Sequence, residues 1–151
     1  MQSPWAASEL GVTVFDRNSK RRSANYRYPQ LPWLEVKKGV PHEATAQIYR
    51  DYAISLNVNT VENSPTMFSR RLIEILGCGG VAVTNPALSV ERYFKDFCHV
   101  VHSEDECKEL FDRLRGGPSP LDIERARAGA EYVLREHTWA HRLEEVLRVI
   151  A

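Results

Sequence analysis

Two adjacent arginines, Arg70 and Arg71, and a glutamate one turn later, Glu74, are the side chains whose types and spacing best suit chemistry. They follow a short polar loop and open a segment with helical periodicity. The first amides of a helix have no internal partner, and the helix dipole favours negative charge at that end. Cations there cost about 0.3–1 kcal/mol unless an anion joins them. The pattern therefore predicts an anion site and a phosphate-bearing ligand.

A plain structural role explains the same residues equally well. An ion pair between Arg70 and Glu74 on a solvated helix face needs no ligand, although it has the weaker of the two orientations for such a pair. The residues alone leave both interpretations open.

The helix that carries these residues is predicted to run from about residue 67 to residue 76, with Thr66 as its N-cap and Ser69 within its first turn. Its apolar positions share one face, which we expect to pack on the sheet. These positions are Phe68, Leu72, Ile75 and Leu76.

Strands and helices are predicted to alternate along the chain. Strands are expected near residues 12–15, 34–36, 54–58, 81–84 and 99–102, and helices near residues 5–10, 42–52, 67–76, 89–94, 104–114, 120–134 and 139–150. Strands separated by helices indicate parallel β-α-β units and an α/β fold.

The last three predicted helices have clear start signals and apolar stripes. Ser103, Pro120 and Thr138 are expected to begin them. We expect the stripes to be core: Cys107, Leu110, Phe111 and Leu114; then Ile123, Ala126, Ala130, Val133 and Leu134; then Trp139, Leu143, Val146, Leu147 and Ile150.

Composition narrows the class of protein. The chain has 20 basic and 20 acidic residues, so a formal net charge of zero favours neither nucleic acid nor an anionic membrane as a partner. A basic cluster at residues 20–22 lies near aromatic residues at 26–28, but we interpret it as a solvated loop. No apolar run reaches the length of a membrane span. The three cysteines have neither disulfide nor metal spacing, which favours a cytoplasmic location.

The stretch from Tyr52 to Thr84 resembles the C-terminal domain of glycosyltransferases with the GT-B fold, which have two Rossmann-like domains. It is most similar to their CgeB-like, spore-maturation branch, and the resemblance extends over the chain from about Val12 onward. It rests on the stretch from Tyr49 to Asn57 that enters the loop, on the run from Asn63 to Arg71, on Glu74, on Gly77-Cys78-Gly79-Gly80 where the helix stops, and on His137-Thr138-Trp139 with Arg142.

The resemblance implies one partial Rossmann-like nucleotide-sugar-binding domain at residues 1–151, with a parallel sheet and a helical C-terminal tail. Such a domain begins with a central strand before the one matched by residues 12–15, so we expect residues 1–151 to lack that strand and the N-terminal acceptor domain. The lack would leave exposed sheet edges that favour self-association, or would force the strands near residues 12 and 54 to pair directly. We therefore expect no sugar transfer by this chain alone.

The resemblance also implies roles for individual residues. Glu74 matches a glutamate that contacts the ribose, and phosphates are expected at Ser69, Arg70 and Arg71. Gly39 and Val40 match a segment that meets the nucleobase. Thr66 stands where retaining members have a glutamate that contacts the transferred sugar, so the stereochemical outcome stays open. The resemblance implies no metal and no cofactor, and catalytic residues are not assigned.

Three functions follow from these observations. The first is the donor-binding half of a glycosyltransferase that uses a nucleotide-diphosphate sugar and an unknown acceptor. The second is a Rossmann-like binding module without transfer activity, which the departure at Thr66 favours. The third is an interaction module that docks through its sheet edge and helical tail.

Overall fold

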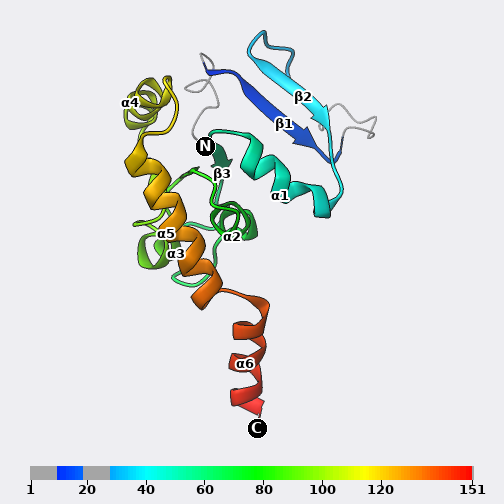
Figure 1. The fold of residues 1–151 in the computed structure, drawn as a ribbon, viewed down its shortest axis with the longest axis vertical. Helices are drawn as coiled ribbons and strands as arrows, with labels where there is room; N and C mark the ends of the chain where they lie inside the picture. The colour runs from blue at the N-terminus through cyan, green and yellow to red at the C-terminus, as the bar shows by residue number, and fades with distance from the viewer. Residues whose placement is uncertain (1–9, 19–27, 151) are drawn as a thin grey trace. The chain divides into compact units, whose positions relative to one another are not determined.

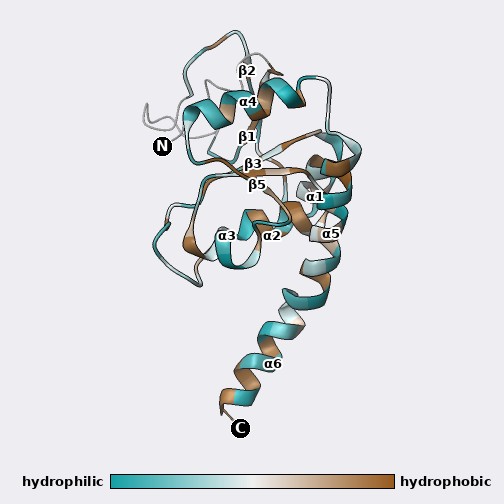
Figure 2. Ribbon diagram, turned by 90° about the vertical axis from the view of Figure 1, so that its left-hand side faces the viewer, coloured by the Kyte–Doolittle hydropathy of each residue, from teal (hydrophilic) through white to brown (hydrophobic). Residues whose placement is uncertain are grey.

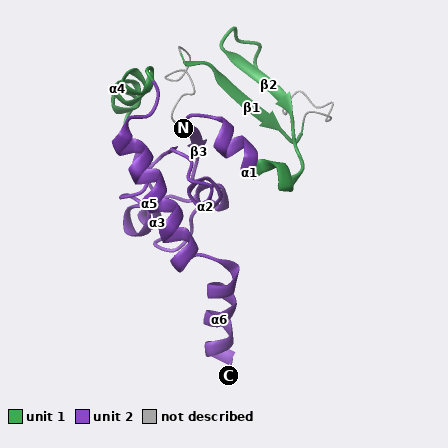
Figure 3. Cartoon of the chain, viewed as in Figure 1, with its two compact units in different colours: residues 1–45, 103–116 green, residues 46–102, 117–151 purple. Residues whose placement is uncertain are grey.

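The computed structural model describes residues 10–18 and 28–150. The chain divides into two compact units (Figure 3), residues 1–45 with 103–116 and residues 46–102 with 117–151. The predicted helix near residues 5–10 falls almost wholly outside the described residues, as does the basic cluster at residues 20–22.

Among the residues that the structure describes, the first unit contains two parallel strands, one complete helix and the start of another. Strand β1 (Val12–Asp16) pairs with β2 (Leu34–Lys38), in a register that places Val12 opposite Leu34. Helix α4 (Glu104–Leu114) begins after Ser103, whose side chain accepts a hydrogen bond from the Glu106 amide. The N-cap predicted at Ser103 is confirmed. Helix α1 (His42–Asp51) starts in this unit and ends in the other.

The second unit contains a three-stranded parallel sheet and four further helices. The strand order is β3 (Ser55–Asn57), β4 (Ala82–Thr84) and β5 (His99–Val100). The helices, labelled in Figure 1, are α2 (Arg70–Gly77), α3 (Leu88–Tyr93), α5 (Pro120–Glu136) and α6 (Trp139–Ile150). Parallel strands that alternate with helices confirm the predicted α/β class.

The described strands form two small sheets, one in each compact unit. Strand β1 has β2 as its neighbour, and β3 has β4. Direct pairing of β1 with β3, which was one of the two outcomes expected from the sequence, stays a prediction, because the two strands belong to different compact units.

Helix α2 supplies the centre of the core in the second unit. Leu72, Ile75 and Leu76 are fully buried, and the predicted apolar face is confirmed. Helix α2 packs against α5 (Figure 1). At Gly129 of α5, an added Cβ would lie 3.2 Å from the Leu76 side chain and 3.1 Å from the Cβ of Phe97. Glycine therefore allows the two helices to approach closely.

Helix α5 begins at Pro120, as predicted, with an additional device that the prediction did not include. Ser119 and Asp122 form a capping box, in which each side chain bonds the backbone amide of the other residue. The apolar stripe predicted for α5 is partly wrong. Ala126 and Val133 are buried, whereas Ile123 and Leu134 are exposed.

The core role predicted for α6 is wrong in this structure. Trp139 is 84% exposed, and no residue of the helix is buried. The hydropathy colouring in Figure 2 shows apolar positions along α6, and the exposed ones are Trp139, Leu143, Val146, Leu147, Val149 and Ile150. The amphipathic pattern predicts a helix correctly, but it does not show whether a neighbour covers the apolar face.

No helix among the described residues combines the length and the apolar character needed to cross a membrane.

Candidate functional site

The N-terminus of α2 lies beyond the carboxyl end of β3, and its cap is Ser69. Ser69 has extended backbone angles, φ −66° and ψ 128°, and its side chain makes no capping bond. Thr66 is not the N-cap, so that prediction is wrong. The Ser64 hydroxyl accepts hydrogen bonds from the backbone amides of Thr66 and Met67, at 3.4 and 3.1 Å, and holds this segment in a turn. The helix starts three residues later than a Thr66 cap requires.

Arg70 and Arg71 are therefore the first two residues of the helix, where cations oppose its dipole. Both are exposed. Arg70 Nε lies 2.9 Å from Glu74 Oε1. The ion pair of the plain structural interpretation is thus present, while Arg71 makes no ion pair with any described residue.

Tyr49 of α1 joins this cluster from a different element. Its hydroxyl donates to Glu74 Oε2 at 3.4 Å. Burial, with the Glu74 carboxylate as the next cause, raises the pKa of Tyr49. Glu74 is held from two sides, because Arg70 contacts one carboxylate oxygen and Tyr49 the other. The sequence resemblance includes Tyr49 but predicts no contact between it and Glu74, since 25 residues separate the two.

A network of buried polar side chains fills the carboxyl edge of the sheet beside α2. Asn57 and Asn59 are each 3% exposed, and Thr84 is 1% exposed. The Thr84 hydroxyl oxygen accepts from Asn57 Nδ2 at 2.9 Å and from Asn59 Nδ2 at 3.0 Å. No donor among the described residues reaches Asn57 Oδ1. An unpartnered buried acceptor costs on the order of 1–3 kcal/mol.

Sequence reasoning missed this network, although a signal for it was present. Asn57 and Thr84 lie opposite each other in the register of β3 and β4. The carboxyl ends of neighbouring parallel strands meet at one edge, which is where ligands bind in open α/β sheets. Polar residues at the ends of two predicted strands could therefore have been combined into one cluster.

The residues predicted for nucleotide-sugar binding fall into two groups. Thr66, Ser69, Arg70, Arg71 and Glu74 lie together in the loop and first turns of α2. Gly39 and Val40 belong to the other compact unit.

Gly39 has a structural reason of its own. Its amide donates to Asp16 O at 2.9 Å, and an added Cβ would lie 2.6 Å from the Cα of Arg17. Any side chain at this position would clash with that backbone. The role of Gly39 and Val40 at a nucleobase stays a prediction.

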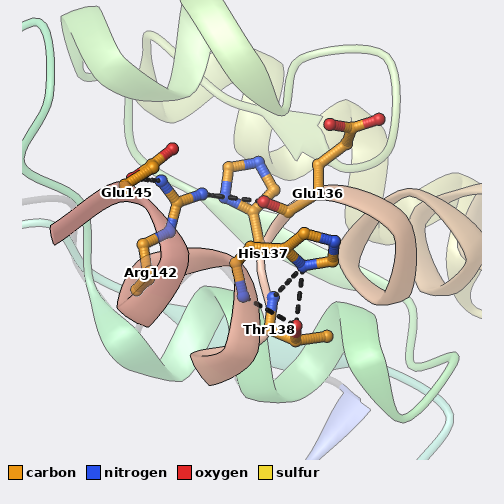
Figure 4. A network of polar contacts seen from close by, with 6 residues as sticks. Glu136, His137, Thr138, Arg142 and Glu145 are labelled. Atoms are coloured by element: carbon orange, nitrogen blue, oxygen red, sulfur yellow. Dashed lines mark hydrogen bonds and ion pairs between the residues drawn. The ribbon is translucent and has the colours of Figure 1, made fainter. Parts of the chain in front are cut away.

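The junction of α5 and α6 contains His137, Thr138 and Trp139, which with Arg142 form the C-terminal part of the sequence resemblance. Figure 4 shows the Arg142 side chain between Glu145 and the end of α5. Its guanidinium donates to Glu136 O at 2.8 Å, lies 2.9 Å from His137 Nδ1, and donates to Glu145 Oε2 at 2.7 Å. The Thr138 hydroxyl accepts a hydrogen bond from the His141 backbone amide at 3.4 Å. Thr138 therefore caps α6, as predicted, and His137 lies at the junction of the two helices.

The His137 ring packs among aromatic rings close to the loop before α2. Its centroid lies 5.0 Å from that of Tyr132, 5.1 Å from that of Phe94 and 6.0 Å from that of Phe68. Burial, followed by the nearby Arg142 guanidinium, lowers the pKa of His137. A guanidinium can only donate, so Nδ1 accepts and the ring proton resides on Nε2.

This shift predicts a loss of stability in acid. An unfolded histidine has a pKa of about 6.5, and the folded pKa is lower, so the unfolded chain takes up the proton first. The stabilisation from neutral His137 is present above about pH 6.5 and is lost as the pH falls towards the folded pKa. We expect His137→Gln to make the free energy of unfolding less dependent on pH below about 6.5, by up to one proton.

Urea denaturation at several pH values measures this dependence. His42→Gln is the control, because His42 is exposed on α1. Equal flattening in both variants would contradict a special environment at His137.

The described residues hold no cluster of three or more histidine, cysteine, aspartate or glutamate side chains suited to a metal ion. His99 has a structural partner instead. Its Nε2 lies 2.9 Å from Asp122 Oδ1, and both side chains are almost fully buried. This pair links β5 to the capping box of α5.

Comparison with known proteins gives one match. A family described as glycosyl transferase-like matches residues 8–148 of the 151-residue chain. No curated protein and no solved structure gives a significant match. The family match extends over both compact units and includes all of the predicted site residues.

Proposed function

Because this chain belongs to the glycosyl transferase-like family, we propose that it binds the nucleotide-diphosphate part of a sugar donor in a glycosyl transfer reaction. The family supports a role in glycosyl transfer in general. The observation that carries the finer proposal is the position of Arg70 and Arg71 as the first two residues of α2, beyond the carboxyl end of β3. The proposal includes membership of the CgeB-like branch and the C-terminal domain of the GT-B fold.

The chemistry of transfer explains why cations occupy this position. When the sugar leaves, negative charge develops on the departing diphosphate. Amides at a helix N-terminus and nearby arginines stabilise such charge without reorganising during the reaction. The Ser69 hydroxyl makes no capping bond and adds a neutral donor at the same end. In this proposal these groups, and not a bound metal ion, neutralise the diphosphate.

Glu74 completes the proposed site as the partner of the ribose hydroxyls. It lies one turn from Arg70, and Arg70 and Tyr49 fix the direction of its carboxylate. A carboxylate that accepts hydroxyl hydrogen bonds contributes about 1.5–3 kcal/mol. The same helix would then hold phosphate at its start and ribose one turn later.

Calorimetric titration of the full chain with uridine and guanosine diphosphates tests the proposal. We expect at least one of them to bind, and we expect Glu74→Gln to weaken that binding about tenfold or more. Glu74→Gln should reduce the affinity for a 2′-deoxyribonucleoside diphosphate less than the affinity for the ribose form, because the deoxy ligand lacks one of the hydroxyls.

Glu109→Gln is the matched control, because it makes the same chemical change at an exposed position of α4. Absence of binding by both diphosphates would refute the proposed function. Binding without donor turnover is expected of this chain under both interpretations, as the donor-binding half of a transferase and as a binding module, so turnover by the chain alone does not enter this test.

A further inference from the structure

Asn59 makes several hydrogen bonds across the carboxyl edge of the sheet, to the end of β4 and to the start of α2. Its side-chain Nδ2 donates to Thr84 Oγ1 at 3.0 Å and to Asn85 O at 3.2 Å. Its Oδ1 accepts the Ser69 amide at 3.1 Å. One buried side chain thus connects the end of β4 to the N-cap of α2.

The Asn59 backbone is held equally firmly. Its amide donates to Asn85 Oδ1 at 2.7 Å, and its carbonyl accepts from Asn85 Nδ2 at 3.0 Å. Asn85 Nδ2 also donates to Glu62 Oε1 at 2.6 Å. The two asparagines each bond the backbone of the other, so the start of the polar loop is fixed to β4 at both the backbone and the side-chain level.

The choice of asparagine has an electrostatic consequence for α2. Aspartate is a common partner for the donors at a helix N-terminus, but it brings a negative charge. The Asn59 carboxamide accepts the Ser69 amide without that charge. The positive end of α2 and Arg71, which makes no ion pair with any described residue, therefore keep their attraction for an external anion, while Arg70 already contacts Glu74.

We propose that Asn59 is the positioning residue of the phosphate site. Its carboxamide fixes Ser69 in the extended conformation that begins α2 at Arg70, and its neutrality leaves the electrostatic field of the helix end for the diphosphate. The choice of ligand rests on the proposed function, whereas the positioning of Ser69 rests on the contacts themselves.

Two substitutions of Asn59 test its charge and its positioning role. Asn59→Asp keeps an acceptor for the Ser69 amide, adds a negative charge, and replaces the Nδ2 donor to Thr84 Oγ1 and Asn85 O by an oxygen. We expect affinity for uridine or guanosine diphosphate to fall at least about tenfold. Affinity for the nucleoside without phosphates should change little. Asn63→Asp is the matched control, because it makes the same chemical change at an exposed position of the same loop. It should leave diphosphate affinity close to that of wild type.

Amide hydrogen exchange tests the positioning without any ligand. The Ser69 amide should be protected in wild type and in Asn59→Asp, and should lose protection in Asn59→Ala. Unchanged protection in Asn59→Ala would overturn the positioning role, and equal diphosphate affinity of Asn59→Asp and wild type would overturn the role of neutrality. If wild type binds no diphosphate, the proposed function fails, and Ser69 exchange still decides whether Asn59 positions the helix start.

Discussion

Replacing both Arg70 and Arg71 by alanine is expected to lower affinity for a nucleoside diphosphate by about 100-fold or more. Each replacement removes a charge-assisted hydrogen bond to phosphate, which contributes about 1.5–3 kcal/mol to binding. A change of 1.4 kcal/mol corresponds to a factor of ten in affinity. Affinity for the nucleoside alone should change little, because the nucleoside carries no phosphate. Calorimetric titration of the full chain with both ligands measures the difference.

A loss of folding cannot account for this result. Removing two cations from a helix N-terminus relieves an unfavourable interaction with the dipole, while the exposed ion pair of Arg70 with Glu74 contributes at most about 1 kcal/mol. The two effects oppose each other. We therefore expect the free energy of unfolding to change little.

A second double substitution, which removes two positive charges elsewhere on the chain, separates direct phosphate contact from a general effect of net charge. Arg135 and Arg148 are exposed, and each forms an ion pair with a nearby glutamate. Replacing both by alanine changes the net charge by the same amount on α5 and α6. If this control weakens diphosphate binding as much as the loss of Arg70 and Arg71, the arginines of α2 are not direct phosphate ligands.

Leu76→Ala is expected to lower the free energy of unfolding by about 2–5 kcal/mol. Leu76 is fully buried in the core between α2 and α5, beside Gly129. Truncation removes apolar contacts and leaves a cavity that two closely packed helices cannot easily close. Since whole domains are stable by only about 5–15 kcal/mol, this substitution should remove a large fraction of the total.

Leu134→Ala is the matched control for this prediction. Leu134 lies on α5 and is 64% exposed, although the periodicity of the sequence predicted that it is buried. Its truncation should cost about 0.5 kcal/mol or less. Urea denaturation of both variants compares the two sites. Equal losses would mean that Leu134 is covered in solution and that the exposed surface of α5 is an interface.

The sequence alone was sufficient to predict those features of the fold whose physical cause acts within a few neighbouring residues. The repeat of apolar residues at helical spacing placed Leu72, Ile75 and Leu76 on one buried face. Pro120 and Thr138 marked helix starts, since a fixed φ angle and a capping hydroxyl act within one turn. The order of strands and helices also follows from periodicity, and with it the α/β class.

Tertiary structure decided which apolar faces are covered. Ile123 and Leu134 of α5, and the apolar positions of α6, satisfy the same periodic rule as α2 but remain exposed. Periodicity describes one helix, whereas burial needs a second element at the right distance. Close packing of α5 on α2 depends on Gly129, whose neighbours come from α2 and from the segment before β5.

Tertiary structure also decided the polar contacts of the candidate site. Local sequence suggested Thr66 as the cap of α2, but the structure places Ser69 there, because Asn59 accepts the Ser69 amide across ten residues. Asn59 is in turn held by Asn85, which is 26 residues away. Arg70, Arg71 and Glu74 could be selected from one short segment of sequence. The groups that position them lie on other strands and helices, and only folding brings those elements together.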